Sequence, residues 1–273
     1  MALVAVIMPC HNGQRTVRQA IESVLAQTFT DWELVVVNDG STDESAAFLD
    51  RMATADPRIR VIHNPRPSGV AAARNRALHA TTARYVAFLD CDDAWVPEKL
   101  SLQLAAMEQH RAALACGPYD VMDGDGRLIG STRVRPGSLE YQDALGDNPI
   151  GCLTVVLDRS ICGPVEFTPT LLRSEDYQLW LSILRRGLRG ICLSDTLGRY
   201  RVHGKSLSSN KLAAARCRWR VYRTFEKLDL FASSYYFCVY AVTGVMKMIR
   251  MRHGRFLNDN PRWRLVARKP VNQ

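Results

Sequence analysis

The sequence predicts an α/β fold whose central sheet is mostly parallel and Rossmann-like, with helices on both faces. Short apolar runs of strand length alternate with segments in which apolar residues recur at helical spacing. Strands and helices that alternate in this way are typical of parallel sheets. With 273 residues, 47% of them hydrophobic, the chain is expected to form one large globular domain with room for an appendage.

The first part of the chain alternates strand and helix most clearly. The first strand is expected at residues 3–8, and an apolar face between Val17 and Leu25 predicts the helix that follows. Ser41 and Glu44 have the spacing of a capping box, which predicts that the second helix begins there. The other strands are expected at residues 34–37, 59–62 and 85–89, and the other helices at 70–80 and 97–110.

The later part of the chain is less regularly patterned. Residues 119–131 contain two Asp-Gly pairs and are expected to form a hairpin. Irregular structure is expected at residues 136–149, and a further strand at 153–157. A helix is expected from Ser174 to Gly187, because a serine can cap it and two acids occupy its first turn.

Polar segments follow each of the first four expected strands. The carboxyl ends of parallel strands lie at one edge of a sheet, where loops and helix N-termini converge and ligands bind. We therefore expect these segments to line one binding site. They are Pro9–Gly13, Asn38–Asp43, His63–Gly69 and Asp90–Asp93.

The segment Asp90–Asp93 carries three carboxylates, those of Asp90, Asp92 and Asp93. Like charges this close raise one another's pKa values unless a cation compensates them. Mg²⁺ or Mn²⁺ would do so, since such ions are held by one or two carboxylates together with phosphate oxygens and water. Loop acids that only face solvent are the plainer interpretation, but the position at a strand end favours a site for a metal ion and a diphosphate.

Five ordered motifs resemble the nucleotide-sugar glycosyltransferases of family 2, which have the GT-A fold. The similarity covers roughly residues 4–187. The motifs are VIMPCHN, SVLAQTFTDWELVVVNDGSTD, GVAAARNRAL, YVAFLDCDDAW and EDYQLWL. The resemblance implies that residues 1–210 form a catalytic domain. Its nucleotide-sugar-binding half would span about residues 1–115 and its acceptor-binding half about 116–210.

The resemblance also implies roles for single residues on the donor side. Asp39 matches the acid that contacts the base, often uracil. Asp90 and Asp92 match a DxD-type segment that holds ribose and metal, and Asp92 and Asp93 are the favoured metal ligands, with Mn²⁺ or Mg²⁺ as the cofactor. An aromatic is more usual at the position of His11. The remaining implied donor-binding residues are Pro9, His11, Asn12, Arg74, Arg201 and Lys205, and His203 is an implied metal ligand.

Asp176 matches the catalytic base in the ED motif of inverting members, with Glu175 beside it. A carboxylate in the first turn of a helix is stabilised by the helix N-terminus, so we expect Asp176 to stay ionised near neutral pH. It could then take the proton from an acceptor hydroxyl that attacks the anomeric carbon. Without the other motifs, two ordinary first-turn acids would be the better interpretation.

The positive charge of the chain is confined to its last quarter. Residues 211–273 carry 14 Lys/Arg and 3 Asp/Glu, whereas residues 1–210 carry 22 and 24. Residues 230–246 are uncharged and rich in aromatics, and they are marginal for crossing a bilayer. We expect a basic helical appendage at 211–273 that contacts anionic membrane through residues 211–269. Packing of the apolar part on the catalytic domain is equally compatible with the pattern, and no nucleic acid is expected.

The cysteine pattern and the N-terminus favour a cytoplasmic protein, peripheral on the cytosolic face of the inner membrane. The eight cysteines form no CxxC pair, and no disulfide framework or signal peptide is expected. The functional prediction is an inverting, metal-dependent glycosyltransferase that moves a hexosyl or N-acetylhexosaminyl group from a UDP-sugar. The acceptor would be a glycan or lipid-linked glycan in polysaccharide, O-antigen or capsule synthesis. The alternatives are a sugar nucleotidyltransferase and a non-catalytic protein that binds membrane surfaces or nucleic acid.

Overall fold

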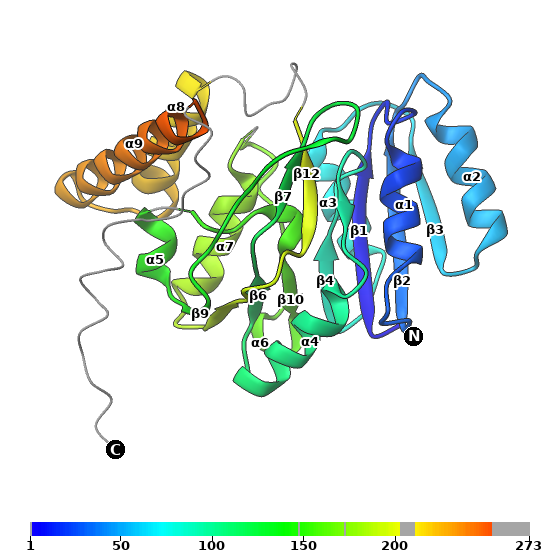
Figure 1. Cartoon of the computed structure of the whole chain (residues 1–273), viewed down its shortest axis with the longest axis horizontal. Helices are drawn as coiled ribbons and strands as arrows, with labels where there is room; N and C mark the ends of the chain where they lie inside the picture. The colour runs from blue at the N-terminus through cyan, green and yellow to red at the C-terminus, as the bar shows by residue number, and fades with distance from the viewer. Residues whose placement is uncertain (1, 147, 172, 203–210, 253–273) are drawn as a thin grey trace.

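The computed structural model describes residues 2–146, 148–171, 173–202 and 211–252, and contains two sheets (Figure 1). The larger sheet has eight strands in the order β3-β2-β1-β4-β10-β6-β11-β9. All but β9 and β10 run parallel to β1. Its strands are β1 (Val4–Cys10), β2 (Trp32–Asp39), β3 (Ile59–Asn64), β4 (Tyr85–Phe88), β6 (Leu114–Cys116), β9 (Gly137–Leu139), β10 (Val156–Asp158) and β11 (Gly190–Cys192).

The smaller sheet has the order β5-β12-β7-β8 and brings the loop after β4 together with a segment from much later in the chain. In β5 (Ala94–Trp95), Ala94 pairs antiparallel with Arg199 of β12 (Gly198–Arg201). The expected hairpin of residues 119–131 is present as β7 (Asp120–Met122) and β8 (Leu128–Ser131).

Helices cover both faces of the larger sheet, which confirms the predicted fold class (Figure 1). Alternate residues of β1 contribute to two different cores: Ala5 and Ile7 to one, Val4 and Val6 to the other. The helices of the body are α1 (Val17–Leu25), α2 (Ser45–Ala55), α3 (Val70–His79), α4 (Lys99–His110), α5 (Tyr141–Gly146), α6 (Arg159–Cys162) and α7 (Glu175–Leu184).

Three local expectations are wrong. The capping box does not form, because Ser41 Oγ accepts a hydrogen bond from the Asn12 N–H and α2 begins only at Ser45. Residues 136–149 contain β9 and α5, which are too short to show periodicity in the sequence. The run at 153–157 is divided between a 3₁₀ turn (Cys152–Thr154) and β10, since a short apolar run is compatible with either structure once it is buried.

The C-terminal segment packs on the body through α8 (Lys211–Arg220), a π-helical turn η3 (Val221–Phe225) and α9 (Leu230–Arg252). Val221 and Tyr222 are fully buried in the same core as α3 and α7. The Tyr222 hydroxyl donates to the Leu145 carbonyl at 2.7 Å. Phe231 is 90% exposed on the outer side of α9. Among the helices of the described residues, none combines the length and apolar character needed to span a bilayer.

Candidate active site

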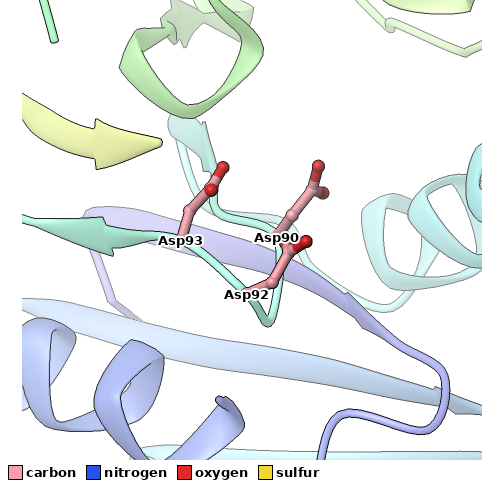
Figure 2. Close-up of side chains that lie close together, drawn as sticks. All are labelled: Asp90, Asp92 and Asp93. Carbon is pink, nitrogen blue, oxygen red and sulfur yellow. The ribbon is translucent and has the colours of Figure 1, made fainter. Parts of the chain in front are cut away.

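The three aspartates after β4 lie together in the structure. Oxygen atoms from Asp90, Asp92 and Asp93, one from each, all lie within 4.8 Å of one another. Figure 2 shows the three side chains extending from one loop between β4 and β5. Asp93 is buried, whereas Asp90 and Asp92 are half-buried. We call the segment Asp90–Asp93 the acidic loop.

Asp93 sits in an electrostatically unfavourable position for an anion. Burial and the neighbouring charges of Asp92 and Asp90 hold the pKa of its carboxyl well above its usual range. The Arg201 N–H donates to Asp93 Oδ1 at 2.9 Å and opposes this effect only in part. The acidic loop therefore brings three carboxylates together, and the buried one, Asp93, lies where its charged form is disfavoured.

Arg201 of β12 holds the acidic loop in place through hydrogen bonds to Asp92 and Asp93. Its side chain is buried, and Nε donates to the Asp92 carbonyl at 2.9 Å. Nη1 donates to the carbonyls of Asp123 and Gly124 in the β7–β8 turn, and Nη2 donates to Gln19 Oε1 of α1. These bonds tie the loop to two other elements. A role for Arg201 in donor binding stays a prediction, and His203 and Lys205 lie outside the described residues.

Arg74 of α3 links the acidic loop to the start of α7. Nη2 donates to both carboxylate oxygens of Asp90, at 2.7 and 2.9 Å, and Nη1 donates to Glu175 Oε1 at 2.9 Å. Burial disfavours the Arg74 charge, but the carboxylates of Asp90 and Glu175 keep its pKa well above the usual range. Glu175 thus forms an ion pair with the buried guanidinium of Arg74. The neighbouring Asp176 accepts no hydrogen bond from Arg74 among those described, so its carboxylate is available for another role.

Asp176 lies in the first turn of α7 and is half-buried. Its Oδ1 accepts a hydrogen bond from the Tyr177 N–H at 2.7 Å. Burial raises the pKa of the Asp176 carboxyl, and this outweighs the opposing effects of Arg74, the Tyr177 N–H and Arg218. The ionisation of Asp176 near neutral pH stays a prediction. A carboxylate with a raised pKa is the stronger proton acceptor.

Asp39 at the end of β2 is enclosed by the loop after β3. Its Oδ1 accepts from Asn64 Nδ2 and Ser68 Oγ, at 2.6 and 2.7 Å, and its Oδ2 accepts from the Gly69 N–H at 2.8 Å. Burial raises the pKa of this carboxyl, but the hydrogen bonds from Asn64, Ser68 and Gly69 together bring it below its usual value. Asp39 therefore positions the 64–69 loop, and contact with a base stays a prediction.

The loop after β1 is fixed by its polar side chains. His11 Nδ1 lies 2.7 Å from the Asp39 carbonyl, so Nδ1 carries the proton and Nε2 accepts from Asn12 Nδ2 at 3.2 Å. Asn12 is left-handed, with φ of 52°, and its Oδ1 accepts from the Thr42 N–H. Pro9 is buried within β1. The loop segments after β1 and β2 thus form one connected rim.

Sequence reasoning missed Gln19 and Arg218, and it included Ser68 in the expected binding segment His63–Gly69 without giving it a role of its own. Gln19 is a single polar residue that no motif distinguishes. The contacts of Gln19 with Arg201 and of Ser68 with Asp39 appear only in the structure. Arg218 is one of several cations in α8, and composition alone gave no reason to separate it from the others. Its burial beside Tyr177 is a tertiary property.

Solved structures of two other proteins have a similar fold. The mannosyltransferase PcManGT from Pyrobaculum calidifontis, solved in complex with GDP-Man and Mn²⁺, aligns with a TM-score of 0.65 and 16% identity, over 97% of this chain and 79% of that chain. S. aureus TarS 1–349 aligns with a TM-score of 0.66 and 17% identity, over 87% of this chain and 70% of that one. These likenesses define the class: the chain has a GT-A type fold.

A model of the family described as "Glycosyl transferase family 2" matches residues 5–156, and the chain belongs to this family. TuaG of Bacillus subtilis (strain 168), provisionally described as a teichuronic acid biosynthesis glycosyltransferase, is 38% identical over 90% of this chain and 98% of its own length. WfgD of Escherichia coli, a UDP-Glc:alpha-D-GlcNAc-diphosphoundecaprenol beta-1,3-glucosyltransferase, is 37% identical over 90% of this chain and 94% of its own length. The chain is a glycosyltransferase of polysaccharide biosynthesis.

Proposed function

We propose that the protein is an inverting, metal-dependent transferase that moves one sugar from a UDP-sugar to a lipid-linked glycan. The observation that carries this proposal is the cluster of three carboxylates in the acidic loop, which Arg74 links to the start of α7, where Asp176 lies. Membership of family 2 favours this function over a sugar nucleotidyltransferase and over a non-catalytic binding protein.

The acidic loop fits a divalent cation. Its donors are carboxylate oxygens, which Mg²⁺ and Mn²⁺ prefer, and Asp90 is already engaged by Arg74. Asp92 and Asp93 would therefore hold the ion. When bound, a cation of this kind neutralises the diphosphate of the donor and eases its departure. The name of WfgD supports a UDP-sugar as the donor. PcManGT was solved with a different donor, GDP-Man, and its Mn²⁺ supports the choice of a divalent cation.

Asp176 is the proposed catalytic base. Its carboxylate takes the proton from the acceptor hydroxyl, while the hydroxyl oxygen forms a bond to the anomeric carbon of the donor sugar. The bond between that carbon and the diphosphate oxygen breaks on the opposite face, and the nucleoside diphosphate leaves with the electron pair. Arg74 neutralises Glu175, so the charge next to Asp176 is fixed while the proton moves.

The C-terminal segment is proposed to rest on the cytosolic face of the inner membrane. Leu212, Leu230, Phe231 and Val242 are exposed apolar residues of α8 and α9, and Arg216 and Arg220 are exposed cations of α8. Such a surface suits anionic headgroups. It also suits an acceptor on a lipid carrier, which is the kind of acceptor for which WfgD is named.

The base is tested by Asp176→Asn, with Asp31→Asn as the matched control. Asp31 is exposed and precedes β2, at the opposite edge of the sheet from the site. We expect Asp176→Asn to lower transfer by about 10²- to 10⁴-fold, the usual range for loss of a general base. Binding of UDP with Mn²⁺, measured by calorimetry, should be unchanged. Full turnover by Asp176→Asn would overturn the assignment.

A further inference from the structure

Arg218 is a buried cation that the site described so far does not use. It lies in α8 and is only 8% exposed. Its guanidinium carbon is 3.5 Å from the centre of the Tyr177 ring and 4.8 Å from the centre of the Tyr240 ring. Rings from α7 and α9 thus hold a side chain of α8 in one place.

Among the described residues, no carboxylate forms an ion pair with Arg218, and its charge reaches the Asp176 carboxyl only at longer range. Burying a guanidinium without an anion costs several kcal/mol, and contact with an aromatic ring returns only about 0.5–2 kcal/mol. Arg74 shows the usual solution, since two carboxylates neutralise it. Nη1 of Arg218 is buried without a hydrogen-bond partner among the described residues, so this preorganised cation keeps hydrogen-bonding capacity for an anion.

The position of Arg218 indicates which anion it meets. Tyr177 directly follows Asp176, and the charge of Arg218 acts on the Asp176 carboxyl. The acceptor hydroxyl must approach Asp176 if that residue is the base. The diphosphate of the donor is already matched to the acidic loop. Helices α8 and α9 lie away from β1, β2 and β3 in Figure 1, beyond α7. An anion at Arg218 therefore belongs to the acceptor.

We propose that Arg218 binds a phosphate oxygen of the acceptor, on the diphosphate that links the glycan to its lipid. This inference rests on the proposed function. A planar guanidinium can donate two parallel hydrogen bonds to a phosphate. Arg216 and Arg220, which are exposed on the same helix, add positive potential that attracts such an anion. The acceptor is thus selected by its linkage group as well as by its sugar.

The test uses the full chain and a probe without sugar. UDP and Mn²⁺ are first titrated to saturation, which reports on the donor site alone. Undecyl diphosphate is then titrated by calorimetry into wild type, Arg218→Gln, Arg218→Lys and the control Arg51→Gln, which removes an exposed cation of α2. We expect Arg218→Gln to weaken binding of the probe at least about tenfold, Arg218→Lys to weaken it less, and Arg51→Gln to change it by less than about threefold.

Each outcome decides the question. Equal affinity of wild type and both Arg218 variants for undecyl diphosphate overturns the inference. So does a preference for decyl β-glucuronide that depends on Arg218, because the anion would then be a sugar carboxylate. If Arg218→Gln does not fold, as judged by loss of UDP binding, the Arg218→Lys titration decides alone. If wild type binds no UDP with Mn²⁺, the proposed function fails first, in a separate titration.

Discussion

Asp39 and Asp93 are equally buried aspartates near the same edge of the larger sheet, but their surroundings shift their pKa values in opposite directions. Their exposed fractions are 4% and 3%. Asp39 accepts hydrogen bonds from Asn64, Ser68 and Gly69, and its pKa is lowered. Asp93 faces Asp90 and Asp92, and its pKa is raised.

The difference separates two kinds of carboxylate at this edge of the sheet. The carboxylate of Asp39 is satisfied within the chain, so it stabilises the loop that surrounds it. The acidic loop places one oxygen from each of three carboxylates within 4.8 Å of the others, which favours a site completed by a cation. Three predictions test this difference between Asp39 and the acidic loop.

The largest effect is expected for Asp92→Asn. Removing one proposed metal ligand should lower metal-dependent binding of UDP at least about 100-fold. Loss of a residue that only supports a ligand lowers metal affinity by up to about 100-fold, and loss of the ligand itself should cost at least as much. Thermal shifts with UDP and Mn²⁺, against the same protein in EDTA, measure it. Asp39→Asn provides the comparison. If it abolishes the metal-dependent part of the thermal shift as completely as Asp92→Asn does, the proposed difference between Asp39 and the metal-binding aspartates is wrong.

A smaller effect is expected on the free energy of unfolding, and its sign should differ between Asp39→Asn and Asp93→Asn. In Asp39→Asn the side chain can turn an amide towards the N–H groups of Ser68 and Gly69, so the free energy of unfolding should fall by about 1–3 kcal/mol. In metal-free Asp93→Asn, one of three crowded charges disappears while Oδ1 can still accept from Arg201, so stability should hold or rise. Urea unfolding in EDTA tests both variants. A loss of stability in Asp93→Asn would contradict the contrast.

The smallest effect is a pH dependence. The pKa of Asp39 is lower in the folded chain than its ordinary value of 3.8. Its stabilising contribution is therefore present in full above that value, and it is lost as the pH falls through the lower, folded-state pKa. The stability difference between wild type and Asp39→Asn should be constant from pH 7 to about pH 5 and shrink towards pH 3. A difference that grew on acidification would show the opposite sign of the shift.

The sequence could predict the residues that end strands, because the alternation of strand and helix places those ends together. Asp39 and the three acidic-loop residues were found in this way. It could not predict that Asn64, Ser68 and Gly69 surround Asp39, since these contacts span 25 to 30 residues and no local pattern encodes them. The short elements β9 and α5 escaped because three to six residues cannot establish a period. Arg218 escaped because burial, not residue type, gives it significance.

Arg201 clamps the acidic loop from 108 residues further along the chain. During synthesis, β1 to β4 therefore emerge from the ribosome and can pair well before the clamp exists. The parallel strands can therefore form early. The geometry of the three aspartates is completed later, when β12 pairs with β5. A nascent chain stopped before Gly198 would keep the Arg74 bonds to Asp90 but would lack the Arg201 bonds to Asp92 and Asp93. The protein thus cannot complete its charged centre until most of it has been made.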